Sequence, residues 1–225
     1  MFSPSRYFDL SSEPLAYLFD GLENVWEVLP KLPAIAKQLT ETPLNLGEVH
    51  PTAIIEGAVF IAEGVRIAPH VHIQGPVYLG KNAEVRHGAF IRPNSIIGEH
   101  CVVGHDSEIK SSLMLSHSHA PHFAYVGDSI LGRKVNLGSG TALANFKLAG
   151  DEIVLAYEGS RIPTGLRKMG AIIGDYSSLG CNTVTAPGTI IGKNSFIYSL
   201  ISLRGVIPEN SIVKPQAGFV IEERR

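Results

Sequence analysis

Three histidines lie within six residues of one another, at His117, His119 and His122, in the stretch SHSHAPHFAYVGDS. Imidazole changes its charge near pH 7, so such a group can act as a general base, hold an anion or ligate a metal ion. The same three histidines can also be part of a polar surface loop. The choice between these interpretations depends on the secondary-structure elements that hold the side chains. The rest of the sequence must therefore be considered first.

The composition excludes several classes of function. The chain has 225 residues, a formal net charge of −2 and no run of lysine or arginine. This length fits one well-packed domain with a small appendage, and the charge offers no basic face to nucleic acid. The N-terminus lacks the apolar core of a signal peptide, and no apolar run approaches a membrane span. We therefore expect a soluble cytoplasmic protein with no nucleic-acid partner, no membrane insertion and reduced thiols at Cys101 and Cys181.

Aliphatic residues recur at every sixth position from Val49 to Leu115, and a mostly small residue follows four positions after each of the first eleven. A period of six fits neither an α-helix nor an alternating strand. It is typical of a solenoid of short parallel strands joined by tight corners. The sequence therefore predicts an all-β hexapeptide-repeat β-helix, in which three hexapeptides make one coil and the aliphatic side chains point inward.

The six-residue period fails twice, after Leu115 and again over residues 144–171, and it returns after each failure. We interpret both failures as loop insertions, near 116–125 and 144–171, in a continuous domain that covers residues 49–225. Such loops often carry function because the scaffold positions them. Residues 1–48 are rich in Leu, Ala and Glu, and they predict a short N-terminal helical extension that packs Trp26 against the solenoid.

The repeat is similar to that of the left-handed β-helix acyltransferases. The stretch HFAYVGDSILGRKVNLGSGTALANFK, residues 122–147, resembles the acetyltransferase half of the bifunctional N-acetylglucosamine-1-phosphate uridyltransferase/glucosamine-1-phosphate acetyltransferases. The stretch RKMGAIIGDYSSLGCNTVTAPGTIIG resembles stand-alone proteins similar to the C-terminal domains of sugar nucleotidyltransferases. The resemblance implies a left-handed parallel β-helix, a homotrimer with sites between subunits, and acetyl-CoA as co-substrate with no tightly bound cofactor.

The resemblance also implies roles for single residues. His122 is similar to the general base that takes a proton from the substrate amine, and Asn145 is similar to a residue that orients this histidine. The implied substrate-binding residues are Arg92, His119, Tyr125, Asn136 and Lys168, and the residues implied to face coenzyme A are Ser139, Cys181 and Lys214. No residue is assigned to a metal.

Two positions depart from the family pattern. His119 stands where the family has a lysine, three residues before the catalytic histidine, and a neutral imidazole holds phosphate less firmly than an ammonium group. The Asn-Tyr-Asp-Gly of the family reads Asn145-Phe146-Lys147-Leu148 here, before the second insertion. Whether the acceptor carries a phosphate therefore stays open.

We expect an acetyl-CoA-dependent acyltransferase that acts on an amino sugar, such as glucosamine-1-phosphate or a related sugar phosphate or nucleotide sugar. A thioester is already activated, so a positioned base is sufficient for its aminolysis. One alternative is a metal hydratase, because the γ-class carbonic anhydrases share the fold and have two local zinc ligands five residues apart, as His117 and His122 are. A second alternative is a non-catalytic module that binds sugar nucleotides or supports assembly.

His87 and His105 form a further pair, 18 residues apart in the repeat. Because one coil contains 18 residues, the two side chains are expected to stack on one exposed face. We interpret them as a polar column on an exposed face, and the alternative is a role in lining the cleft.

Overall fold

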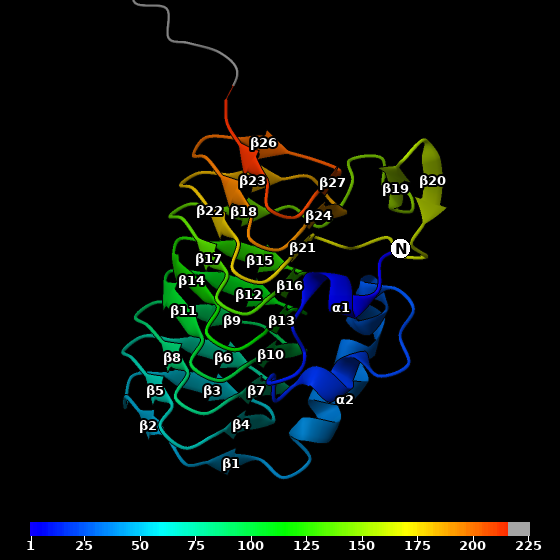
Figure 1. Cartoon of the computed structure of the whole chain (residues 1–225). Helices are drawn as coiled ribbons and strands as arrows, with labels where there is room; N and C mark the ends of the chain where they lie inside the picture. Colours follow the sequence, from blue (N-terminus) through cyan, green and yellow to red (C-terminus); the bar gives the residue numbers. More distant parts are fainter. Residues whose placement is uncertain (216–225) are drawn as a thin grey trace, which may run out of the picture.

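The computed structural model describes residues 1–215 and shows a stack of coils with one strand per coil in each of three parallel sheets (Figure 1). The predicted left-handed parallel β-helix is confirmed. Sheet A contains β1 (Leu44–Asn45), β4 (Val59–Ile61), β7 (Val77–Leu79), β10 (Ser95–Ile97), β13 (Leu113–Met114), β16 (Ile130–Leu131), β21 (Ala171–Ile173), β24 (Thr189–Ile191) and β27 (Val206–Ile207).

Sheet B contains β2 (Glu48–Val49), β5 (Arg66–Ile67), β8 (Glu84–Val85), β11 (Val102–His105), β14 (His119–His122), β17 (Asn136–Leu137), β22 (Ser178–Leu179), β25 (Phe196–Ile197) and β28 (Ile212–Val213). Sheet C contains β3 (Ile54–Glu56), β6 (His72–Gln74), β9 (Phe90–Ile91), β12 (Glu108–Lys110), β15 (Tyr125–Gly127), β18 (Ala142–Leu143), β23 (Val184–Thr185) and β26 (Ser202–Leu203). The strands are short because each one fills a single side of the coil.

The inward side chains of all three sheets form the core of the solenoid. On sheet A these are Ile61, Leu79, Ile97, Met114, Leu131, Ile173 and Ile191, all of them buried. Burying one such side chain contributes roughly 1.5–3 kcal/mol, and the coils above and below provide most of that burial. This packing explains the six-residue period of the sequence.

The predicted loop insertion near 116–125 is wrong, because these residues continue the coils. Strand β14 pairs with β11 in parallel, and Val103 lies opposite Ala120. The period fails there because two steps between inward residues, from Ile109 to Met114 and from Val126 to Leu131, are five residues long. Leu115, which the six-residue count places in the core, instead packs on the outer side under the N-terminal segment.

The second interruption of the period contains an antiparallel hairpin, β19 (Val154–Tyr157) and β20 (Ser160–Pro163). The coils on its two sides are direct neighbours, since Leu131 in β16 lies opposite Ile173 in β21. The hairpin projects beside sheet A, close to the start of the chain (Figure 1). Leu155 in the hairpin and Ile153 just before it belong to the apolar layer outside that sheet.

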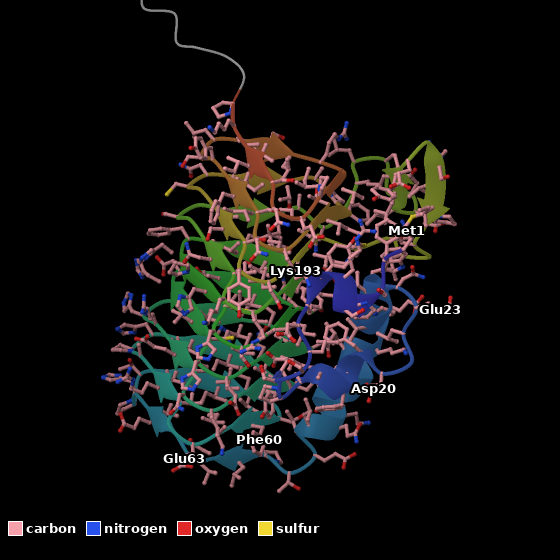
Figure 2. The ribbon with its side chains drawn as sticks, viewed as in Figure 1. Met1, Asp20, Glu23, Phe60, Glu63 and Lys193 are labelled. Carbon is pink, nitrogen blue, oxygen red and sulfur yellow. The ribbon has the colours of Figure 1, made fainter. Side chains whose placement is uncertain are left out.

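The N-terminal segment covers the outer face of sheet A. It contains α1 (Pro4–Tyr7), the 3-10 helices η1 (Ala16–Phe19) and η2 (Val25–Lys31), and α2 (Leu32–Leu39). Its apolar side chains, Trp26 among them as expected, pack with the outward residues Ile96, Leu113, Ile130, Ile172 and Ile190. Figure 2 shows Met1, Asp20 and Glu23 on this covering layer and Phe60 and Glu63 near the first coils. Among residues 1–215, sheets B and C are the two faces that no helix or hairpin covers.

Within residues 1–215, none of the helices is long and apolar enough to cross a membrane.

Candidate functional site

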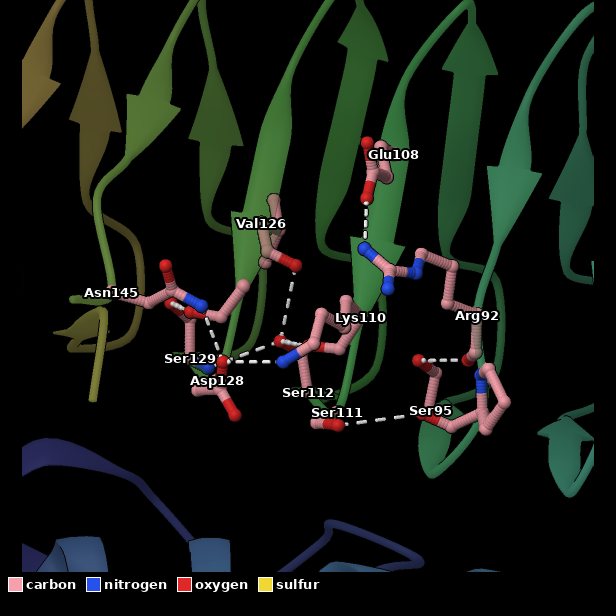
Figure 3. Close-up of polar contacts among 12 residues, drawn as sticks. Arg92, Ser95, Glu108, Lys110, Ser111, Ser112, Val126, Asp128, Ser129 and Asn145 are labelled. Carbon is pink, nitrogen blue, oxygen red and sulfur yellow. Dashed lines mark hydrogen bonds and ion pairs between the residues drawn. The ribbon is translucent and has the colours of Figure 1, made fainter. Parts of the chain in front are cut away.

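The outer face of sheet C carries a polar cluster, which we call the sheet C cluster (Figure 3). The Arg92 guanidinium donates to Glu108 Oε1 at 2.8 Å, and Lys110 Nζ donates to Asp128 Oδ2 at 2.9 Å. The Asn145 amide donates to the same Asp128 oxygen. The side chains of Lys110 and Asp128 are only 19% and 16% exposed, so this ion pair is screened less by solvent than a surface pair.

The repeat explains why the two cations of this cluster lie together. Arg92 and Lys110 each follow an inward isoleucine by one residue, at Ile91 and Ile109, and the two isoleucines are opposite each other in β9 and β12. Side chains on either side of an inward residue point outward, and neighbouring strands are about 4.8 Å apart. The coil therefore presents two positive charges at adjacent levels of one face.

Tyr125 lies on the same face, opposite Glu108 in the neighbouring strand. Burial raises the pKa of the Tyr125 hydroxyl, and the negative charges of Glu108 and Asp128 raise it further. This hydroxyl is thus a proton donor at neutral pH. Gly127 leaves the room for it, since a Cβ at that position would lie 2.6 Å from the Tyr125 hydroxyl and 2.8 Å from the Asn145 amide nitrogen.

Asn145 and Lys168 are brought together by the second insertion. Phe146 and Lys168 form an isolated antiparallel bridge, and the backbone N–H of Met169 donates to Asn145 O at 3.0 Å. Within residues 1–215 no hydrogen bond joins Asn145 to His122, and the Asn145 amide is directed to Asp128 instead. Its role in orienting His122 stays a prediction from the resemblance.

His122 lies at the B–C corner, the turn between sheets B and C, at the end of β14. Its side chain is exposed. The corner continues over the next coils, where Gly140 N donates to His122 O at 3.1 Å, Asn182 N to Ser139 O at 2.8 Å, and Leu200 N to Cys181 O at 2.9 Å. His122, Ser139 and Cys181 therefore occupy equivalent positions on three successive coils.

Lys214, the third residue expected to face coenzyme A, follows β28 in the last described coil. Its ammonium group lies 5.6 Å from the centre of the Tyr198 ring. Four coil steps separate β14 from β28, which corresponds to about 19 Å along the stack. The three predicted coenzyme A residues thus follow one corner of the solenoid, starting from His122.

The remaining two predicted substrate residues lie on a different face. His119 in β14 and Asn136 in β17 are opposite each other on the outer side of sheet B. Burial lowers the pKa of His119, and the nearby Arg86 guanidinium lowers it further. The imidazole is therefore neutral at pH 7, so at this position it adds no charge that would attract a phosphate.

His117 lies on the opposite edge of sheet B from His122. Its ring stacks on that of His100, with centroids 4.7 Å apart and an interplanar angle of 2°. His117 lies in the turn before β14, and His122 ends that strand, whose three steps span roughly 10 Å, whereas zinc–nitrogen bonds are about 2 Å long. Within one chain His117 and His122 cannot ligate the same metal ion.

Three members of the sheet C cluster, Glu108, Lys110 and Asp128, were not selected from the sequence. Lys110 could have been selected from the sequence, because it occupies the same outward position as Arg92 one coil later. Its partner Asp128 belongs to the segment where the period has shifted, and that contact appears only once the coils are stacked.

The two cysteines are in opposite environments, and this predicts their reactivity. Cys101 is buried in the core, where burial raises the pKa of its thiol to about 12, and it donates to Leu115 O at 3.1 Å. Cys181 is exposed at the B–C corner. Because the thiolate is the reactive form, we expect one thiol per native chain to react with a colorimetric disulfide reagent, and two after unfolding. Cys181→Ser should abolish the native reaction, and a fast native reaction that survives this change would contradict the placement of Cys101.

Known proteins are similar to this chain in sequence. The GMPPB C-terminal domain family matches residues 73–160. The bifunctional protein GlmU of Methanococcus aeolicus is 34% identical over 207 residues, which is 92% of this chain and 50% of that protein. A bifunctional sugar-1-phosphate nucleotidylyltransferase/acetyltransferase of Sulfurisphaera tokodaii is 39% identical over 154 residues, which is 68% of this chain and 38% of that protein.

A solved structure shares the fold. The UDP-N-acetylglucosamine acyltransferase of Campylobacter jejuni superposes with a TM-score of 0.54 at 16% identity, covering 73% of this chain and 70% of that one. The chain spans about half the length of the GlmU relatives that it matches over most of its own length. The chain is a left-handed β-helix protein, and most of its length is similar to part of the GlmU proteins and of a bifunctional sugar-1-phosphate nucleotidylyltransferase/acetyltransferase.

Proposed function

We propose that this chain is an acyl-CoA-dependent N-acyltransferase whose acceptor is an amino sugar bearing a phosphate, either as a sugar 1-phosphate or within a nucleotide sugar. One observation carries the proposal. An exposed histidine, His122, stands at the edge of an uncovered face on which Arg92, Lys110, Tyr125 and the Asn145 amide are gathered.

The chemistry assigns one step to each group. The acceptor nitrogen attacks the thioester carbonyl while the imidazole of His122 takes a proton from it, so that a C–N bond forms. The tetrahedral intermediate then collapses, the C–S bond breaks, and the thiolate of coenzyme A receives the proton that His122 holds. Tyr125, kept protonated by its surroundings, donates to an acceptor oxygen, and the two cations hold the phosphate oxygens.

Acyl-CoA is proposed to follow the B–C corner. The thioester would lie at His122, with the rest of the molecule running past Ser139 and Cys181 towards Lys214. The ammonium group of Lys214 suits the phosphates of coenzyme A, because a flexible point charge binds phosphate without a fixed orientation. Saturating coenzyme A should therefore slow modification of Cys181, and an unchanged rate would contradict this path.

In a homotrimer with sites between subunits, the predicted substrate-binding residues on sheet B of one chain could meet those on sheet C of another. His119 and Asn136 point away from sheet B, whereas Arg92 and Tyr125 point away from sheet C, so the two pairs do not converge within one chain. Sheet A is covered by the N-terminal segment and the hairpin, which leaves sheets B and C for contact between subunits. In a closed cyclic assembly, sheet B of one chain can face sheet C of the next.

The test of the proposed function is release of free thiol from acetyl-CoA in the presence of single acceptors. Glucosamine-1-phosphate, glucosamine and a nucleotide-linked amino sugar form a sufficient panel, with the N-acetylated product identified by mass. Turnover of a phosphorylated acceptor above that of glucosamine supports the proposal. Thiol release without any acylated sugar, or binding of a nucleotide sugar with no thiol release from any acceptor, would overturn it, and the second result would indicate a binding module.

A further inference from the structure

A second group of potential ligands lies at the B–C corner, one and two coils before His122. It consists of His87, His105 and Asp106, which offer one ligand atom each within 4.8 Å of one another. The Nδ1 atoms of His87 and His105 are 3.3 Å apart, and Asp106 Oδ2 is 3.3 Å from His105 Nε2. The two side chains lie next to each other in one column, as expected, with ring centroids 5.2 Å apart and the rings tilted by 31°.

The spacing of the two Nδ1 atoms fits two ligands of one tetrahedral metal ion, and Asp106 offers a third ligand atom within 4.8 Å of a ring nitrogen of each histidine. Two donors bound to zinc at roughly 2.0–2.1 Å are about 3.3 Å from each other, which matches the separation of the two Nδ1 atoms. Two imidazoles and a carboxylate make a ligand set suited to divalent transition metals, and such a set leaves a fourth position for water. The His105 ring can rotate about its side-chain bonds, so that either Nδ1 or Nε2 faces the ion.

The coil geometry holds the three side chains in place. Asp106 has a φ of 48°, the left-handed conformation that turns the chain at this corner. The neighbouring coil has Gly88 at the equivalent position, and a Cβ there would clash with the Asp106 carboxylate. The ring of Phe123 meets His105 edge-on at 5.0 Å and limits the movement of that imidazole.

We propose that His87, His105 and Asp106 form a binding site for one divalent transition-metal ion, with Zn²⁺ as the best-fitting ion. The site lies outside the set of residues assigned to acyl transfer. It adjoins that set, because His105 and His122 are opposite each other in β11 and β14.

Zinc titration of the metal-free protein tests this proposal without reference to activity. The tag-free full chain, treated with a chelator and dialysed, is titrated with Zn²⁺ at pH 7.5 against a colorimetric zinc indicator. We expect one ion per chain. His105→Ala should weaken the affinity by about 100-fold and Asp106→Asn by about tenfold. Lowering the pH to 5.5 should weaken binding by the wild type, because protons compete for the imidazoles.

His72→Ala is the matched control for this titration. His72 has a carboxylate partner, with Nε2 2.8 Å from Glu56 Oε2, but its ring stacks on Phe90 and not on a second imidazole. This variant should bind zinc as the wild type does. Equal loss in His72→Ala and His105→Ala, unchanged affinity in His105→Ala, or no zinc bound by a wild type that is folded by circular dichroism would each overturn the site.

Discussion

Replacement of His122 by alanine is expected to lower kcat for acyl transfer by about 10²–10⁴-fold, the usual contribution of a general base. The side chain is exposed at the B–C corner and makes no hydrogen bond to another side chain within residues 1–215, so its loss should leave the fold intact. The KM for acyl-CoA should change little, since the imidazole would act on the acceptor nitrogen. Steady-state thiol release with the best acceptor of the panel measures both constants.

His100→Ala is the control for this substitution. His100 is also an exposed histidine at a corner of sheet B, but at the opposite edge, where it stacks on His117. It should retain the activity of the wild type. If the two variants lose the same activity, or if His122→Ala retains more than about a tenth of kcat, another group takes the proton and the assignment of His122 is wrong.

Replacement of Glu13 by alanine is expected to cost about 3–5 kcal/mol of the free energy of unfolding, as does removal of one partner from a buried polar pair. The Glu13 side chain has no exposed surface. It accepts from Ser116 N at 3.1 Å, from Ser116 Oγ at 3.0 Å and from Leu15 N at 3.2 Å. Arg133 Nε lies 3.7 Å from it and has no other partner within residues 1–215. Without the carboxylate, the three donors lose their buried acceptor, and the Arg133 guanidinium loses the negative charge beside it.

Urea unfolding followed by circular dichroism measures this change, and amide hydrogen exchange locates it. We expect faster exchange in the N-terminal segment and in the outer residues of sheet A, because Glu13 joins the two. Glu23→Ala, which removes an exposed carboxylate from the same segment, should change the free energy of unfolding by less than about 0.5 kcal/mol. A similar loss in both variants would show that the buried contact is not what fixes the segment.

Much of the fold could be predicted from the sequence, because burial inside a coil imposes a period that can be counted. The count fails where the coil shortens. Met114 and Leu115 are both apolar, so the sequence does not say which of them points inward, and the structure selects Met114 because the step from Ile109 is five residues. A shortened step and a true insertion interrupt the period in the same way. Only the second interruption contains a separate element, the β19–β20 hairpin.

The candidate site could be predicted only in part. The resemblance supplied His122, Tyr125 and Asn145, and the coil register explains why the last two lie beside Gly127. Lys110 and Asp128 were missed because their ion pair joins residues 18 positions apart across a shortened coil. The division of the substrate set between sheets B and C also follows from the stacked coils, since the sequence gives spacing but not the face that each side chain occupies.

The central claim is one acyl-transfer site built around His122 from the sheet C face of one chain and the sheet B face of another. Mixed oligomers test it most directly. One variant carries Tyr125→Ala with Asn145→Ala, and the other carries His119→Ala with Asn136→Ala. Each should be nearly inactive alone, and an equal mixture refolded or co-expressed together should regain about a quarter of wild-type activity, because one in four random interfaces pairs two intact faces. Activity in the mixture no higher than the mean of the two separate variants would contradict a site shared between chains.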